Sequence, residues 1–163
     1  ALVTDQPGIC LGVTVADCVP VLLYEENGGV VAAAHAGWKG IVSNVLGETI
    51  SEMRMRYGVT PDKIRAEILP SISSPCFEVG EEVVEKFGEV FPTCDMDRFV
   101  ITGKYAKPHI DLRMAVRLQL LSWGLPGDNV WSSPDCTYSD ARYFSARRDG
   151  FHCGRMLAGI LKI

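Results

Sequence analysis

Residues 13–40 read VTVADCVPVLLYEENGGVVAAAHAGWKG, and this stretch decides how the first part of the chain folds. It contains two apolar runs rich in β-branched residues and alanine, Val19–Tyr24 and Gly29–His35. Between them lies a Glu-Glu-Asn-Gly turn, and Asn-Gly between such runs is a strong signal for a β-hairpin. The stretch therefore predicts two adjacent antiparallel strands.

Cys18 precedes the first of these runs, and His35 ends the second. Antiparallel pairing would bring this thiol and this imidazole to the same end of the hairpin. The neighbouring residues Ala16, Ala34 and Gly37 are small, which leaves room for a ligand or a metal ion. Each side chain taken alone is better explained as a packing residue, because cysteine is among the most buried residue types. Their convergence makes both of them candidate site residues.

The composition is that of an ordinary globular domain. The chain has 163 residues, of which 47% are hydrophobic and 22% charged, with a net charge of −4. This length predicts a single domain, residues 1–163. No basic cluster exceeds the pair Arg147-Arg148, which argues against a nucleic-acid partner, and no apolar run has the length of a membrane span. Because the chain begins at Ala1 inside a strand-like run, we expect an N-terminal segment to be missing.

Six cysteines are scattered without any Cys-x-x-Cys motif, which argues against a zinc ribbon or a redox motif. Three disulfides are allowed by parity alone. A chain with this much apolar core does not need them, so we expect free thiols and a cytoplasmic location.

The rest of the chain predicts a mixed α/β fold. Helices are expected over residues 41–57, 81–91, 111–123 and 151–161. Strands are expected over residues 1–3, 9–15, 63–69, 129–132 and 143–146, with a short strand and turn in 95–105. Neither a Gly-x-Gly-x-x-Gly loop nor a Walker A loop is present, which argues against nucleotide binding through those loops.

Several polar residues are further candidates. Arg147 and Arg148 suit a phosphate or carboxylate, because the arginine fork binds such anions with two hydrogen bonds. The alternative is a surface ion pair with Asp140 or Asp149. Asp17 should face away from Cys18, as neighbours on a strand do, and is expected to cap or hydrogen-bond a turn. For His109 and His152 we expect structural roles.

Five motifs, in this order along the chain, resemble those of the laccase-domain family. This family is also named the multicopper polyphenol oxidase family or a purine nucleoside phosphorylase family. The motifs are TVADCVPV at 14–21, AHAGWKG at 34–40, FEVG at 77–80, Cys136-Thr137, and FSxRRDG at 144–150. The resemblance extends over the whole chain, and the combination of ADC and HAGW at this spacing is specific.

The resemblance implies a four-layer α/β/β/α sandwich with mixed sheets. It also implies a metal, usually zinc, held by Cys18 and His35, with copper as the alternative. A third ligand, the histidine of a Gln-Val-His motif, would lie upstream of Ala1 and has no counterpart here. Family members cleave adenosine, inosine, guanosine or methylthioadenosine with phosphate, and also deaminate adenosine. The implied partners are therefore a small purine nucleoside and phosphate, and we expect Arg147 or Arg148 to contact the phosphate.

Three other functions stay open at this point. A copper-dependent polyphenol oxidase would need many histidine ligands, and this chain has three histidines. A Cys-His hydrolase would use Cys18 as the nucleophile and His35 as the base, without a metal. A binding module would keep the pocket without catalysis. The sequence makes no prediction of the oligomeric state.

Overall fold

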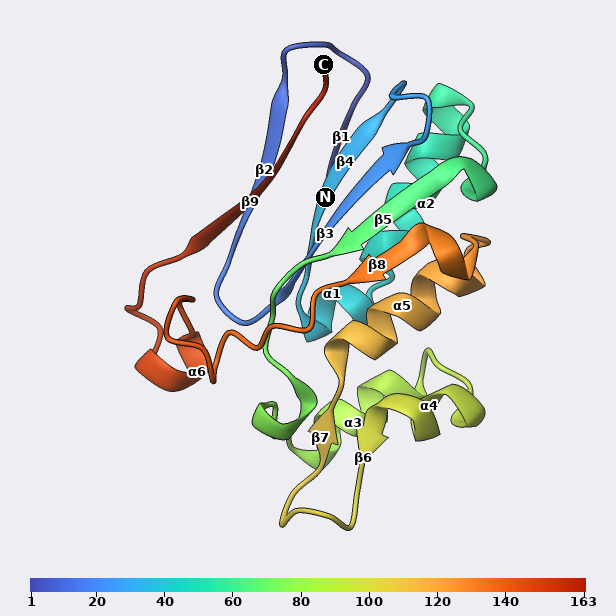
Figure 1. The fold of residues 1–163 in the computed structure, drawn as a ribbon. Helices are drawn as coiled ribbons and strands as arrows, with labels where there is room; N and C mark the ends of the chain where they lie inside the picture. The colour runs from blue at the N-terminus through green and yellow to red at the C-terminus, as the bar shows by residue number, and fades with distance from the viewer.

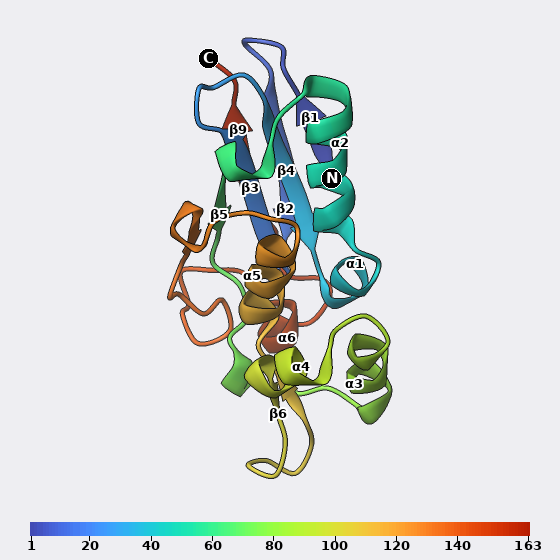
Figure 2. The same ribbon diagram turned by 90° about the vertical axis from the view of Figure 1, so that its right-hand side faces the viewer.

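The protein folds into three layers in a computed structural model that describes residues 1–163. A five-stranded sheet forms the middle layer (Figure 1). Helices α2 (Val45–Tyr57) and α5 (Leu112–Ser122) cover one of its faces (Figures 1 and 2). A two-stranded antiparallel ribbon made of β2 (Cys10–Val15) and β9 (Met156–Leu161) covers the other. The first and last parts of the chain therefore lie side by side in the ribbon.

The middle sheet has the strand order β1-β4-β3-β5-β8. All neighbouring strands are antiparallel except β5 and β8, which are parallel. The strands of this sheet are β1 (Leu2–Thr4), β3 (Val19–Glu25), β4 (Val31–Ala36), β5 (Ile64–Ile68) and β8 (Val130–Ser132). The ribbon pairs β2 (Cys10–Val15) with β9 (Met156–Leu161). A mixed α/β architecture is thus confirmed.

The predicted hairpin is confirmed and lies at the centre of the middle sheet. β3 pairs with β4 in a register that joins Val19 to Ala36 and Tyr24 to Val31. Cys18 immediately precedes β3, and His35 pairs with Pro20. The end of the hairpin opposite the Asn-Gly turn therefore carries both candidate side chains, as the sequence predicts.

Alternation along β3 explains why the sheet can be covered on both faces. Val21 and Leu23 point into a core of 28 buried residues, shared with the helices. Leu22 points the other way, into a small cluster with Leu11, Val31 and Ala33 under the ribbon. A strand buried on both faces needs an uninterrupted apolar run, and Val19–Leu23 supplies it.

Six helices complete the chain. They are α1 (Trp38–Val42), α2 (Val45–Tyr57), α3 (Glu81–Gly88), α4 (Thr93–Phe99), α5 (Leu112–Ser122) and α6 (Ala146–Asp149). The Asp111 side chain caps α5 by accepting a hydrogen bond from the Met114 backbone N–H at 3.0 Å, which confirms the predicted start of this helix. None of the helices combines the length and the apolar character needed to cross a bilayer.

Four predicted elements differ from the structure. The helix expected over 41–57 is broken at Asn44, whose left-handed backbone (φ 58°) separates α1 from α2. Most of 95–105 is helical or turn, because α4 occupies Thr93–Phe99 and only Val100–Ile101 (β6) is a strand. Residues 143–145 are irregular, and Ala146 begins α6.

The largest error concerns the end of the chain. A helix was expected over 151–161, but Met156–Leu161 is the ribbon strand β9. The apolar spacing of this segment fits both the helical and the strand period, and pairing with β2 selects the strand.

The fold has three layers, and the outer face of the ribbon carries no helix of residues 1–163 (Figure 1). The four-layer arrangement stays a prediction.

A small lobe of α3, α4 and the two-stranded β6–β7 (β7 is His109–Ile110) lies at one end of the sheet (Figure 1). Three phenylalanines hold this lobe together. The rings of Phe87 and Phe99 meet edge to face at 5.5 Å, and those of Phe91 and Phe99 at 5.1 Å. Phe99 is 1% exposed and joins the lobe to the main core.

We expect Phe99→Ala to lower the free energy of unfolding by about 3–5 kcal/mol, because it removes buried contacts and leaves a cavity. Urea unfolding followed by circular dichroism measures this change. Phe151→Ala is the matched control, since Phe151 is 87% exposed and should change the stability by less than about 0.5 kcal/mol. Equal effects of the two substitutions would contradict the described packing.

Candidate active site

Cys18 and His35 meet around Gly37 at the end of the β3–β4 hairpin. A Cβ atom placed on Gly37 would lie 2.9 Å from the Cys18 sulfur and 3.8 Å from His35 Nε2. Any larger residue at position 37 would thus push into the space between the two side chains. Glycine at this position keeps the thiol and the imidazole facing one shared space.

The surroundings of the two side chains oppose their charged forms. Burial raises the pKa of the Cys18 thiol, and the negative charge of neighbouring Asp17 raises it further. His35 is the one exposed residue of β4. Its ring is still buried enough to lower the pKa of His35, although a backbone hydrogen bond with Thr14 opposes this shift. The pair is therefore a neutral thiol and a neutral imidazole at pH 7. These surroundings do not activate Cys18 as a nucleophile.

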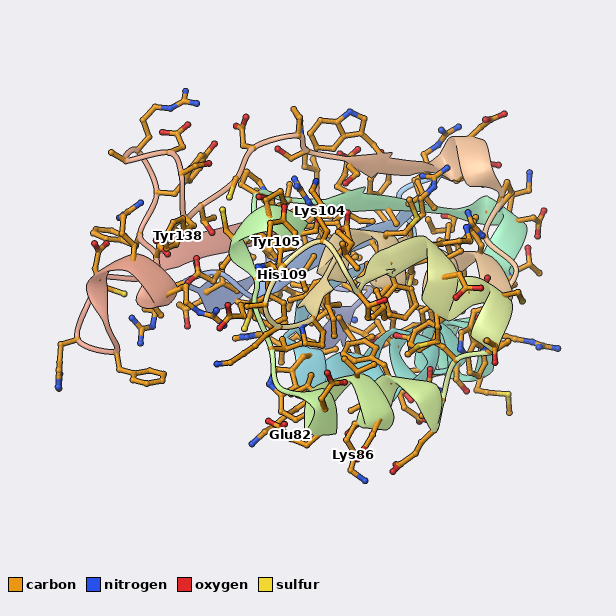
Figure 3. The ribbon with its side chains drawn as sticks, turned by 90° about the horizontal axis from the view of Figure 1, so that it is seen from below. Glu82, Lys86, Lys104, Tyr105, His109 and Tyr138 are labelled. Carbon is orange, nitrogen blue, oxygen red and sulfur yellow. The ribbon has the colours of Figure 1, made fainter.

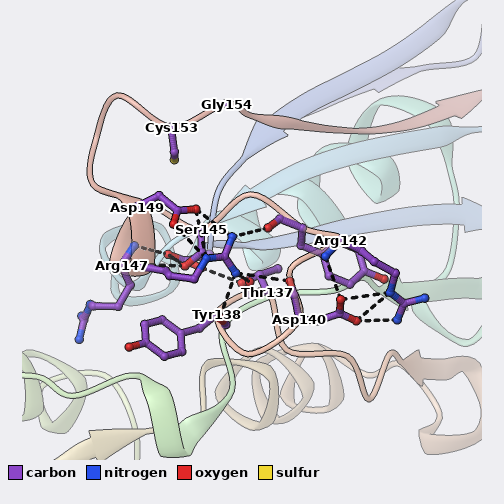
Figure 4. A network of polar contacts seen from close by, with 12 residues as sticks. Thr137, Tyr138, Asp140, Arg142, Ser145, Arg147, Asp149, Cys153 and Gly154 are labelled. Atoms are coloured by element: carbon purple, nitrogen blue, oxygen red, sulfur yellow. Dashed lines mark hydrogen bonds and ion pairs between the residues drawn. The ribbon is translucent and has the colours of Figure 1, made fainter.

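Asp17 is the buried centre of a hydrogen-bond network that joins the start of the central hairpin to the C-terminal loop. Figure 4 shows the residues of this loop, among them Thr137, Ser145 and Arg147. The side chain of Asp17 is 8% exposed and accepts hydrogen bonds from the Thr137 hydroxyl at 2.7 Å, the Ser145 hydroxyl at 3.0 Å and the Arg147 backbone N–H at 2.7 Å. Its backbone is left-handed, with φ at 84°. The predicted hydrogen-bonding role of Asp17 is confirmed by these three donors.

The partners of Asp17 could not be found from sequence spacing, because they lie 120 or more positions away. The only local signal is that the small polar residues Thr137 and Ser145 both fall in otherwise irregular segments. Both are fully buried, and a buried hydroxyl needs a partner.

Arg148 is held by the loop around it. One terminal nitrogen of its guanidinium donates hydrogen bonds to the Thr137 and Tyr138 carbonyls, both at 3.0 Å, and the other donates to the Tyr143 carbonyl at 2.7 Å. It also forms an ion pair with Asp149 at 2.8 Å. Arg148 therefore forms the ion pair with Asp149 that the sequence analysis gave as the alternative to phosphate binding.

Arg147 has a different environment. Its guanidinium forms no ion pair, lies 5.2 Å from the centre of the Phe77 ring and donates one hydrogen bond, to the Glu78 carbonyl at 3.0 Å. It lines a cavity of about 360 Å³ together with Ala16, Asp17 and the exposed Phe151. This volume suits a small organic ligand. The cavity begins two residues before Cys18, although Cys18 and His35 are not part of its wall.

Two larger hollows lie elsewhere. One of about 520 Å³ is lined by Glu25, Gly29 and Lys63 at the turn end of the hairpin, opposite to Cys18. The other, of about 420 Å³, lies between α5 and the segments around Val42 and Phe91. Neither is lined by a residue adjacent to Cys18 in the chain, whereas the smaller cavity is lined by Asp17 and by Arg147, so the smaller cavity is the better candidate for a substrate site.

The other two histidines, His109 and His152, are not part of the candidate site. His109 is buried, its ring stacks on Tyr105 at 4.1 Å, and its Nδ1 lies 3.1 Å from the Lys107 carbonyl oxygen (Figure 3). The predicted structural role of His109 is thus confirmed, whereas His152 is exposed in a turn. No group of three or more His, Cys, Asp or Glu side chains in residues 1–163 is arranged to hold a metal ion.

Comparison with known proteins identifies the family. Residues 1–162 match the family described as "Multi-copper polyphenol oxidoreductase laccase". The chain belongs to this family. The resemblance seen in its ADC and HAGW motifs is therefore confirmed.

Similar proteins carry two kinds of name. A relative from Bacteroides thetaiotaomicron, named purine nucleoside phosphorylase, is 45% identical over 99% of this chain and 60% of its own length. A relative from an unknown prokaryotic organism, named adenosine deaminase RL5, is 43% identical over 99% of this chain and 62% of its own length. The crystal structure of YlmD from Geobacillus stearothermophilus matches with a TM-score of 0.91 and 33% identity, over 98% of this chain and 59% of that one. The chain thus spans about 60% of the length of these proteins.

We expect Asp17→Ala to lower the free energy of unfolding by about 3 kcal/mol, because three donors lose their acceptor and alanine disfavours the left-handed backbone. Asp17→Asn should cost about 1 kcal/mol, since asparagine tolerates this backbone and keeps one acceptor oxygen.

Thermal or urea unfolding measures both values. Asp97→Ala is the matched control, because Asp97 is exposed and has no ion pair. If Asp17→Ala lowered the free energy of unfolding no more than Asp97→Ala does, the hydrogen-bond network around Asp17 would not have this stabilising role.

Proposed function

We propose that this chain carries the metal-binding and phosphate-binding part of a purine nucleoside phosphorylase. The observation that carries the proposal is the convergence of Cys18 and His35 on the space beside Gly37. A phosphorylase of this kind cleaves a purine nucleoside with phosphate and yields the free base and ribose 1-phosphate. Support comes from the relatives of this name and from the cavity next to Asp17.

The donor atoms suit zinc. A thiolate sulfur and an imidazole nitrogen are typical zinc ligands, and a catalytic zinc site usually has three protein ligands and one open position. Cys18 and His35 would supply two of these three, both facing one space. When bound, zinc supplies a Lewis acid and favours the deprotonated thiolate of Cys18.

The other residues of the site hold and orient the substrates. The Arg147 guanidinium has no carboxylate partner, so its positive charge is available to phosphate. Asp17 fixes the backbone of Arg147 through the 2.7 Å hydrogen bond to its N–H. Phe77 lies under the guanidinium and, with Phe151, gives the cavity apolar walls that suit a purine ring.

A second activity, adenosine deamination, is supported by the relative named adenosine deaminase RL5. It would use the same site with water in place of phosphate. The copper oxidase alternative is less well supported, because the three histidines lie in separate parts of the fold: His35 on β4, His109 on β7 and His152 in a turn. The Cys-His hydrolase alternative is opposed by the raised pKa of the Cys18 thiol.

We expect the full-length, zinc-supplied protein to release free base and ribose 1-phosphate from inosine or adenosine only when phosphate is present. Chromatography of the products measures this. Cys18→Ala and His35→Ala should each reduce the rate to background, because each removes a ligand. Cys94→Ala is the control, since Cys94 is exposed on α4. Absence of both base release and inosine formation, with zinc confirmed bound, would exclude the proposed function.

The two arginines give a separate prediction. Arg147→Ala should raise the KM for phosphate roughly 10- to 150-fold, because a charge-assisted hydrogen bond contributes about 1.5–3 kcal/mol. High phosphate should restore its rate. Arg148→Ala should instead lower the melting temperature, because it frees three loop carbonyls, and high phosphate should not restore its rate.

Steady-state kinetics at varied phosphate concentrations test this assignment, with the distant surface residue Arg56 as the control in Arg56→Ala. A phosphate-restored defect in Arg148→Ala and none in Arg147→Ala would reverse the roles of the two arginines.

A further inference from the structure

Two further cysteines, Cys76 and Cys136, lie outside the site described above. Segments 71–76 and 136–139 run next to each other, since Ser71 and Cys136 form a parallel β-bridge and the Thr137 N–H donates to the Ser71 carbonyl at 3.1 Å. The 3-10 turn Ser74–Cys76 then folds back, with the Cys76 N–H donating to the Ser73 carbonyl at 3.0 Å. The Cys76 thiol then lies close enough to Cys136 for that side chain to raise the pKa of Cys76.

The Cys136 sulfur is surrounded by hydrogen-bond donors. The Ser73 hydroxyl donates to it at 3.0 Å, and the Ser73 backbone N–H lies 3.3 Å away. The hydroxyl and the backbone N–H of Ser139 also act to lower the pKa of Cys136. Donors of this kind favour a negatively charged sulfur, since a thiolate accepts stronger hydrogen bonds than a thiol.

The two sulfurs are unequal. Partial burial would raise the pKa of Cys136, but the hydrogen bonds from Ser139 and Ser73 outweigh it and lower this pKa to about 6. Burial raises the pKa of Cys76, as do neighbouring Cys136 and the Asp17 carboxylate, although a hydrogen bond with Ser73 opposes this. One member is thus a thiolate at pH 7 and the other a thiol. Both are partly exposed, so a small molecule can reach them.

We propose that Cys136 and Cys76 form a peroxide-reactive dithiol site, in which Cys136 is the attacking sulfur and Cys76 the resolving one. The hydrogen bonds from Ser73 and Ser139 select Cys136 for the first step. The turn at Ser74–Cys76 places the second thiol beside it.

The chemistry balances with hydrogen peroxide as the oxidant. The Cys136 thiolate attacks one peroxide oxygen, the O–O bond breaks, and hydroxide leaves and is protonated to water, which gives a sulfenic acid. The Cys76 thiol then loses its proton and attacks the Cys136 sulfur, the S–O bond breaks, and a second water forms. Two thiols lose two electrons to one peroxide and become a disulfide. This bond would join the segments that carry Phe77, in the cavity wall, and Thr137, a partner of Asp17.

The test uses the reduced full chain, brief alkylation with iodoacetamide across a pH series, and mass spectrometry of the cysteine peptides. Cys10 and Cys94 are internal references, because both are exposed and neither has this ring of donors. At pH 6 we expect Cys136 to react roughly tenfold faster than these references, since its larger thiolate fraction outweighs its lower intrinsic nucleophilicity. Its reactivity should rise with a midpoint near pH 6.

Peroxide then tests the pair itself. One equivalent of hydrogen peroxide should join Cys76 to Cys136, and in Cys76→Ser a dimedone adduct should accumulate on Cys136. Ser73→Ala should move the alkylation midpoint of Cys136 upward, whereas Ser51→Ala, on α2, should not move it.

The wild-type protein alone decides the outcome, even where a variant does not fold. A Cys136 that alkylates no faster than Cys94 at pH 6 would overturn the proposal. So would peroxide treatment that leaves Cys76 and Cys136 as thiols or joins either of them to another cysteine.

Discussion

The structure depends above all on the buried carboxylate of Asp17. It binds three donors that arrive from the other end of the chain, and it does so at the point where the central hairpin begins. A buried carboxylate without such partners would cost far more than the hairpin contributes, so the C-terminal loop has to close over it. The position of the loop follows from this requirement. As a result, Arg147 lies beside the cavity with its backbone fixed and its charge unpaired.

The central hairpin could be predicted from the sequence because its signals are local. The Asn-Gly turn sets the register, and the register decides that Cys18 and His35 share one end. The start of α5 at Asp111 is local as well, since a side chain caps its own helix. The elements that were predicted wrongly are those in which a distant partner decides. Residues 156–161 become a strand because β2 needs a partner, and α4 forms where the Phe87 and Phe91 rings receive Phe99.

The candidate site shows the same division. Cys18, His35 and the two arginines stand out by residue type, but the sequence cannot separate Arg147 from Arg148. The two residues are neighbours in the chain, but their guanidinium groups differ. That of Arg148 donates to three carbonyls and forms an ion pair, whereas that of Arg147 donates to one carbonyl and lies over an aromatic ring. That difference depends on how the loop of residues 137–149 folds back on itself. The loop has no regular period, and therefore no pattern from which its path could be predicted.

Cys18 and Cys136 have the same side chain, yet their surroundings shift the thiol pKa in opposite directions. Cys18 is partly buried, stands next to a carboxylate and has a raised pKa, which suits the proposed metal ligand, because such a thiol ionises only when a cation is present. Cys136 meets hydroxyl and backbone donors and has a pKa of about 6, which suits a sulfur that ionises without one. The Asp17 charge raises the pKa of Cys18, and the Asp17 carboxylate accepts a hydrogen bond from Thr137, which follows Cys136 in the chain. One buried carboxylate thus borders both cysteine sites, because its hydrogen bond to Thr137 holds together the two segments that carry Cys18 and Cys136.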